Sequence, residues 1–234
     1  SAVVRGLTRR FLEENRNIEV VATASNGKNA VDAVKTNNLD VVVLDIEMPV
    51  MDGLTAIPLI LAAKPKLKIV MSSTLTEANA VVSLKALSAG ASDYVAKPTS
   101  GSDIRGSDDF KRELITKVLA LGGVADPELA AEDNLPGRKR PAMPIKAQPG
   151  QPIVLHKSAT VPPRAIAIGS STGGPQALDT VIPGLDKTLQ QPIFITQHMP
   201  ATFTKILAEH LARDCSRTVS EAKDGQQVKP GEIY

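Results

Sequence analysis

Hydrophobic positions alternate between two spacings along the first 121 residues. Four short segments predict β-strands, at residues 18–24, 39–45, 67–73 and 93–98, and the apolar run at 41–44 marks the second as buried on both faces. Five further segments predict helices, at residues 2–14, 26–38, 53–63, 77–90 and 109–121. Strands that alternate with helices in this way predict an α/β fold, in which helices cover both faces of a parallel sheet.

The pattern stops at residue 122 and resumes at residue 164. Eight prolines fall in between, together with the basic run Arg138-Lys139-Arg140, and this composition is typical of an extended linker. Two more strand-and-helix pairs follow, at 164–170, 173–185, 192–198 and 201–214, before a turn-rich end. We therefore expect a first α/β domain over 1–121, a linker over 122–163 and the N-terminal part of a second α/β domain over 164–234.

Composition narrows the classes of function. The 27 basic and 25 acidic residues leave a net charge of +2, which gives no bulk argument for nucleic-acid binding. No apolar stretch approaches the ~20 residues that span a bilayer, so we expect no membrane insertion. Cys215 is the single cysteine, which excludes a disulfide within the chain and favours a cytoplasmic location. The chain opens on Ser1 rather than Met and stops at Tyr234 inside the second domain, so both ends look cut.

The segment LDIEMPVMDG, residues 44–53, places Asp45 at the carboxyl end of a buried strand. Open α/β sheets hold their chemistry at this edge, where the ends of neighbouring parallel strands meet. We expect Asp45 to meet the hydroxyl cluster at 72–74 and Lys97 there. A carboxylate with a lysine and a hydroxyl nearby is suited to accept a phosphoryl group. A divalent metal would neutralise the charge, with Asp45 and the backbone carbonyl of Glu47 as ligands.

With the motifs D-x-x-M-P-x-M-D-G and A-K-P, the first domain resembles the receiver domain of two-component response regulators. The resemblance implies a flavodoxin-like, doubly wound parallel sheet and a histidine kinase as phosphodonor. It makes Asp45 the phosphoacceptor and Lys97 the phosphate-sensing lysine. Ser73 or Thr74 would be the switch hydroxyl, and Tyr94 the switch aromatic residue. Receivers also use Mg²⁺, held by an acidic pair on a first strand that is absent here, so we expect weak magnesium binding.

The segment GSSTGG, residues 169–174, fits G-x-S-x-G between a strand and a helix, where glycines let Ser171 stand off the sheet edge. The helix behind it offers free N–H groups to a developing oxyanion. His198 ends the next strand, one βαβ crossover further on. We therefore expect Ser171 and His198 to lie side by side as nucleophile and general base. The glycine pattern alone also fits an anion-binding turn, and no acidic residue between the two is placed to orient the histidine.

Residues 164–234, with IGSSTGGPQAL and ITQHMP, resemble the start of the catalytic domain of the CheB family, the chemotaxis protein-glutamate methylesterases. The receiver and the proline-rich linker extend this resemblance over the whole chain. It implies an esterase with Ser171 as nucleophile and His198 as base, without a cofactor, and a triad aspartate in a later stretch of the family. The implied substrates are methyl-esterified glutamates, and also glutamines, of methyl-accepting chemoreceptors. Phosphorylation at Asp45 would regulate the enzyme, and we expect the chain as given to be inactive.

Two alternatives from other classes of function stay open. A receiver can be joined to a DNA-binding output, but such an output needs a helix-turn-helix or a similar reader, which residues 164–234 do not predict. A non-catalytic module would instead use the glycine-rich elbow to hold an anion. The receptors, the kinase and the oligomeric state do not follow from the sequence.

Overall fold

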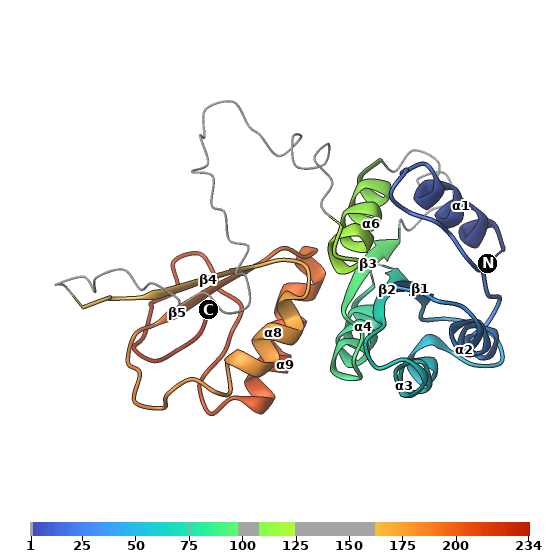
Figure 1. Ribbon diagram of the computed structural model, residues 1–234. Helices are drawn as coiled ribbons and strands as arrows, with labels where there is room; N and C mark the ends of the chain where they lie inside the picture. The colour runs from blue at the N-terminus through green and yellow to red at the C-terminus, as the bar shows by residue number, and fades with distance from the viewer. Residues whose placement is uncertain (1, 75, 98–107, 125–161) are drawn as a thin grey trace, which may run out of the picture.

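The structure, a computed structural model, describes residues 2–74, 76–97, 108–124 and 162–234. Its strands form two parallel sheets, one in the N-terminal part (residues 2–124) and one in the C-terminal part (residues 162–234). Figure 1 shows the two parts side by side, each with helices packed beside its sheet. The predicted α/β fold is therefore confirmed in both parts. Most of the predicted linker, residues 125–161, lies outside the described residues.

The N-terminal sheet has three parallel strands in the order β1-β2-β3. Their bounds are Val41–Asp45 for β1, Lys68–Thr74 for β2 and Asp93–Lys97 for β3. Successive residues of a strand point to opposite faces of the sheet, so each strand contributes side chains to the hydrophobic cores on both faces.

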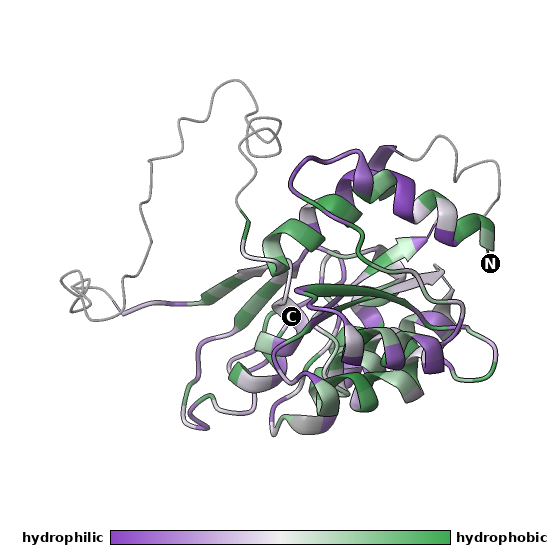
Figure 2. Cartoon of the chain, turned by 45° about the vertical axis from the view of Figure 1, so that its right-hand side comes forward, coloured by the Kyte–Doolittle hydropathy of each residue, from purple (hydrophilic) through white to green (hydrophobic). Residues whose placement is uncertain are grey.

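Five described helices cover this sheet: α1 (Ala2–Glu13), α2 (Gly27–Thr36), α3 (Gly53–Ala63), α4 (Glu77–Ser88) and α6 (Asp108–Leu121). Helices α2, α3 and α4 share one hydrophobic cluster, and α1 and α6 share another. In β2, Ile69 and Met71 belong to the first cluster and Val70 to the second. The sheet is thus covered on both faces, as the alternation of elements predicts. In Figure 2 the helices alternate between hydrophobic and hydrophilic residues, as amphipathic helices do.

The strand predicted over residues 18–24 is wrong. This segment forms no hydrogen-bonded ladder, and most of it is exposed or half-buried. A cavity of about 480 Å³ is lined both by this segment, including Val20 and Ala22, and by Val41 and Val43 of β1. A strand needs a neighbour about 5 Å away for its backbone hydrogen bonds. Because this space separates the segment from β1, its apolar residues line a hollow and do not join the sheet.

The C-terminal part repeats the strand–helix pattern with β4 (Ile166–Ser170), α8 (Gly174–Val181), β5 (Ile193–Gln197) and α9 (Ala201–Asp214). Strands β4 and β5 pair in parallel, with Ser170 opposite Gln197. In the turn-rich end after residue 214, isolated bridges join Ile233 to Ile193 and to Val219. None of the helices in the described ranges is long and apolar enough to cross a membrane.

The two parts pack against each other through helices α4, α8 and α9 (Figure 1). Leu84 and Leu87 of α4 belong to the same buried cluster as Leu207 and Leu211 of α9. At the same contact, His210 of α9 lies 3.4 Å from the Ser88 hydroxyl and 3.3 Å from the Asp179 carboxylate. The N-terminal part thus shares a hydrophobic core with the helices that follow β4 and β5.

Candidate active site

The side chains of Asp45 and Lys97 meet at the carboxyl edge of the N-terminal sheet. Strand β2 lies between their strands, with Asp45 opposite Ser72 and Lys97 opposite Thr74. The Lys97 ammonium donates to Asp45 Oδ1 over 2.7 Å, and both side chains are only partly exposed. The predicted meeting of carboxylate and lysine is therefore present.

The D-G pair of the motif has a structural reason. Asp52 caps the N-terminus of α3, because its carboxylate accepts the Thr55 N–H over 2.7 Å. This hydrogen bond lowers the pKa of Asp52. A Cβ atom at Gly53 would lie 2.1 Å from the backbone oxygen of Asp45, so only glycine fits there. The start of α3 is thereby held against the Asp45 backbone.

The expected switch residues lie on β2 and β3. Ser73 is buried, and its hydroxyl donates to the Thr74 carbonyl over 3.3 Å. The Thr74 hydroxyl accepts a hydrogen bond from the side-chain amide of Asn79 at the start of α4. Tyr94 is buried under α6 and α9, away from the Asp45–Lys97 pair at the other end of β3. Thr74 therefore connects the sheet edge to α4, and Tyr94 connects β3 to the C-terminal part.

These residues fit only part of a magnesium site. Within the described ranges, no group of three or more His, Cys, Asp or Glu side chains is placed to hold a metal ion. Mg²⁺ takes near-octahedral oxygen ligands, usually one or two carboxylates together with water. Asp45 supplies one carboxylate, and one of its oxygens already accepts from Lys97.

Ser171 and His198 lie side by side at the edge of the C-terminal sheet, as predicted. The Ser171 hydroxyl is 3.5 Å from Nδ1 of the His198 ring, and both residues are exposed. The backbone N–H of His198 donates to the Ser170 carbonyl over 2.9 Å, which extends the β4–β5 ladder to the histidine. A hydroxyl next to an imidazole nitrogen is the arrangement that a nucleophile and its base require.

The turn after Ser171 has the geometry of an elbow. Gly173 has a φ of 73°, in the left-handed region that favours glycine, and precedes the first residue of α8. Gly173 has no side chain that could cap the helix, and Pro175 lies in the first turn, where the missing N–H costs nothing. This helix end lies next to Ser171 and favours negative charge, although the N–H of Gly174 already donates to the Ser171 carbonyl over 2.8 Å.

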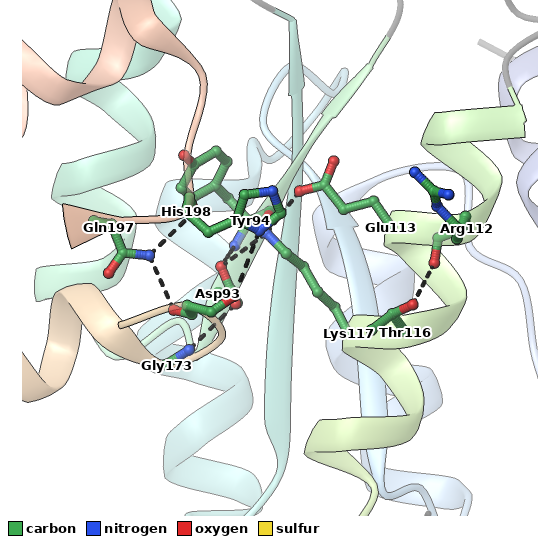
Figure 3. A network of polar contacts seen from close by, with 10 residues as sticks. Asp93, Tyr94, Arg112, Glu113, Thr116, Lys117, Gly173, Gln197 and His198 are labelled. Carbon is green, nitrogen blue, oxygen red and sulfur yellow. Dashed lines mark hydrogen bonds and ion pairs between the residues drawn. The ribbon is translucent and has the colours of Figure 1, made fainter. Parts of the chain in front are cut away.

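A second N–H group at this helix end is engaged by the N-terminal part. The N–H of Gly173 donates to Asp93 Oδ2 over 3.3 Å, and the other oxygen of Asp93 lies 3.3 Å from the Lys117 ammonium. Lys117 also contacts Glu113 over 2.9 Å (Figure 3). Asp93 and Lys117 are both buried. Burial raises the pKa of Asp93, although Lys117 and the two N–H donors of Tyr94 and Gly173 oppose that shift.

An aromatic stack lies beside this ion pair. The rings of Tyr94 and Phe203 are stacked 4.7 Å apart and 6° from parallel, and the Lys117 ammonium lies 4.9 Å from the centre of the Tyr94 ring. Burial raises the pKa of Tyr94, and the charges of Asp93 and Glu113 add to that shift. Strand β3 therefore touches the C-terminal part through two neighbouring side chains.

Sequence reasoning missed three residues of this region: Asp93, Phe203 and Gln197. Asp93 opens a strand whose other end carries Lys97, and nothing in its local pattern indicates a partner 80 positions away. Phe203 has ordinary helical spacing. Gln197 is a polar residue directly before His198, and this position is the one local signal of a role in the site.

The fold and the two sites define a class of protein: a phosphoacceptor-type α/β domain joined to an α/β domain with a serine–histidine elbow. Residues 1–107 match the response regulator receiver domain family, and residues 166–234 match the CheB methylesterase family. Through these two matches, one in each part, the chain is similar to the CheB family of protein-glutamate methylesterases with a receiver domain.

Three curated relatives illustrate the match, and each is a protein-glutamate methylesterase/protein-glutamine glutaminase. The Azospirillum brasilense protein is 52% identical over all of this chain and 61% of its own length. The Rhodospirillum rubrum protein is 51% identical, and the Paramagnetospirillum magneticum protein 49%, again over the whole chain. The chain spans 63% and 64% of these two relatives. It thus covers less than two thirds of the proteins it resembles.

Proposed function

We propose that the protein hydrolyses methyl esters of glutamate side chains on chemoreceptors and deamidates glutamine side chains there, under control of phosphorylation at Asp45. The observation that carries this proposal is the 3.5 Å approach of the Ser171 hydroxyl to the His198 ring at the elbow before α8. The names and identities of the relatives support the choice of substrate.

In the first half of the reaction, Ser171 Oγ attacks the ester carbonyl carbon and its proton passes to His198 Nδ1. The carbonyl oxygen becomes negatively charged, and the N-terminus of α8 favours that charge. The bond to the methoxy group then breaks, and His198 returns the proton to the leaving oxygen. Methanol departs and an acyl-enzyme remains on Ser171.

In the second half, water attacks the acyl carbon and gives its proton to His198. The bond to Ser171 Oγ breaks, the proton returns to Ser171, and free glutamate is released. A glutamine side chain follows the same course with ammonia as the leaving group. Because Nδ1 faces Ser171, the other ring nitrogen, Nε2, is the one that an orienting carboxylate would hold.

We propose the domain division 1–121 for the receiver, 122–163 for the linker and 164–234 for the N-terminal part of the catalytic domain. The two family matches support the first and last ranges. A chemotaxis histidine kinase would phosphorylate the receiver on the cytoplasmic side of the membrane, and Mg²⁺ would be required there as in receivers generally. The net charge of +2 gives no support to a nucleic-acid partner.

Regulation would run through β3. Lys97 at one end of this strand contacts Asp45, while Asp93 and Tyr94 at the other end contact Gly173 and Phe203. A phosphoryl group on Asp45 would redirect the Lys97 ammonium and shift the balance between the packed and separated arrangements of the two domains. Switch movements of Tyr94 and of Thr74, which is tied to α4, would accompany that shift.

The direct test uses a version of the protein that spans the full length of its relatives and measures methanol release from methylated chemoreceptor. Ser171→Ala is expected to lower the rate at least ~10³-fold, whereas Ser216→Ala, at an exposed bend after α9, should retain most of it. Full activity of Ser171→Ala would exclude Ser171 as the nucleophile. The elbow would then be interpreted as part of a non-catalytic module that holds an anion.

The switch is tested separately with a small-molecule phosphodonor. Phosphorylation should raise the rate of the parent protein, and Asp45→Asn should abolish this response without changing the basal rate. Asp40→Asn, an exposed carboxylate just before β1, is the matched control and should respond normally. Normal activation of Asp45→Asn would remove Asp45 from the switch.

A further inference from the structure

Gln197 lies between the two reactive residues and uses its whole side-chain amide there. Its Nε2 group donates to the Ser171 carbonyl over 3.0 Å. It also donates to the His198 carbonyl over 3.2 Å (Figure 3). Its Oε1 atom accepts from the Ser170 hydroxyl over 2.6 Å. One amide group thus joins the end of β4, the elbow and the end of β5.

The elbow is shaped around this amide. A Cβ atom at Gly174 would lie 2.0 Å from Gln197 Oε1, so the first residue of α8 has to be glycine for the amide to fit. The N–H of Gly174 also donates to the Ser171 carbonyl over 2.8 Å. The Ser171 carbonyl therefore accepts two hydrogen bonds, one from the helix and one from Gln197.

The Gln197 side chain is not needed to hold strands β4 and β5 together. The backbone ladder of β4 and β5 pairs Ser170 with Gln197, and the His198 N–H extends it by one bond to the Ser170 carbonyl. The Nε2 bonds are made beyond the ladder, to the peptide groups that carry the Ser171 and His198 side chains. They restrict how these two peptide groups rotate relative to each other.

We propose that Gln197 is a positioning residue, which sets the approach of the Ser171 hydroxyl to the His198 ring. The inference rests on the proposed function, because it concerns the geometry of the same reaction. The Oγ–Nδ1 distance of 3.5 Å is at the long limit of a hydrogen bond. Displacements of about 1 Å at such a site can lower a rate ~10²-fold, so a small rotation of either peptide group matters.

The test compares Gln197→Met and Gln197→Glu in the protein that spans the full length of its relatives. Methionine keeps the length of the side chain and removes its hydrogen bonds, whereas ionised glutamate keeps an acceptor for Ser170 and removes both donors. Both variants are expected to lower kcat for methanol release by about 10- to 100-fold with KM nearly unchanged. Gln190→Met, the same change on an exposed loop, should have no effect.

Amide hydrogen exchange gives a readout that does not depend on turnover. In Gln197→Met, the amides of residues 172–174 and 199 are expected to exchange faster, while the amides of the β4–β5 ladder keep their protection and Tm stays within about 2 °C. Unchanged kcat with unchanged exchange at the elbow would overturn the inference. Loss of ladder protection together with a large fall in Tm would also overturn it, because Gln197 would then be a structural tie.

The two proposals can fail separately. If the parent protein releases no methanol, or if Ser171→Ala is fully active, the esterase assignment fails, and the exchange comparison still decides whether Gln197 restrains the elbow. If the parent protein is active and Gln197→Met matches it in kcat and exchange, the esterase stands and the positioning role fails.

Discussion

The carboxylate of Asp93 accepts a hydrogen bond from the backbone N–H of Gly173, 3.3 Å away, and thereby joins receiver strand β3 to the N-terminus of helix α8. Two positions before Gly173 stands Ser171. The buried Asp93 carboxylate thus accepts from an N–H group at the N-terminus of α8. Without Asp93, this N–H group would favour the oxyanion of the proposed reaction. Contact between the domains and chemistry at the elbow share the same few residues.

Lys117, the ion-pair partner of Asp93, is expected to be essential for the stability of the fold. Lys117 is buried between Asp93 and Glu113, and Lys117→Met would leave the Asp93 charge without compensation. Breaking such a buried pair costs about 3–5 kcal/mol. Arg112→Met on the same helix breaks a mostly exposed pair with Asp109 and should cost under ~1 kcal/mol. Urea unfolding of both variants measures the difference, and equal losses would show that the Lys117 pair does not stabilise the fold.

The raised pKa of Asp93 predicts a pH dependence of stability. The folded protein holds the Asp93 proton more tightly than the unfolded chain, whose carboxyl titrates near 3.8. The stability that Asp93 contributes is therefore fully present below that value, and it is lost as the pH rises through the higher pKa of the folded state. The unfolding free energy of the parent protein should fall relative to that of Asp93→Asn over this range. A rise in the unfolding free energy of the parent relative to that of Asp93→Asn with increasing pH would contradict the direction of the shift.

Tyr94 carries a hydroxyl that has no hydrogen-bond partner among the described residues, although it is buried. An unsatisfied buried hydroxyl costs about 1–3 kcal/mol. Tyr94→Phe removes it and keeps the stack on Phe203, so we expect a higher Tm. Tyr94→Leu loses the stack and should lower Tm. A lower Tm for Tyr94→Phe would mean that the hydroxyl has a partner in solution.

Sequence patterns predicted both reactive pairs for the same physical reason. Asp45 and Lys97, like Ser171 and His198, stand at the ends of parallel strands, and parallel pairing brings strand ends together whatever lies between them. The failure at residues 18–24 has the opposite cause. Apolar spacing predicts a strand only where a neighbouring strand can pair with the segment, and residues 18–24 line a cavity beside β1, remain exposed or half-buried, and pair with no strand.

Contacts between the domains could not be predicted from local patterns. Whether Asp93 meets Gly173, or Tyr94 meets Phe203, depends on how α4 docks against α9, and periodicity carries no information about that docking. The role of Gln197 depends on its rotamer and on the space left by Gly174. Such features require the coordinates of side chains.

The loop after Asp45 contains local strain. Val50 has a φ of 68°, in the left-handed region, and the residue is 83% exposed. This conformation is unfavourable by roughly 1–2 kcal/mol for a β-branched residue, whereas asparagine tolerates it. We expect Val50→Asn to raise the urea midpoint and Val50→Ala to raise it less. A lower midpoint for Val50→Asn would show that the Val50 side chain makes compensating contacts.

The most direct test of the account is to trap the acyl-enzyme. Protein that spans the full length of its relatives is incubated with a fluorophosphonate or an activated ester, digested, and examined by mass spectrometry. The account predicts a covalent adduct on the peptide that contains Ser171, no adduct in Ser171→Ala, and labelling slowed by about 10²- to 10⁴-fold in His198→Ala. An adduct on a different residue, or labelling of Ser171 at the same rate without His198, would contradict it.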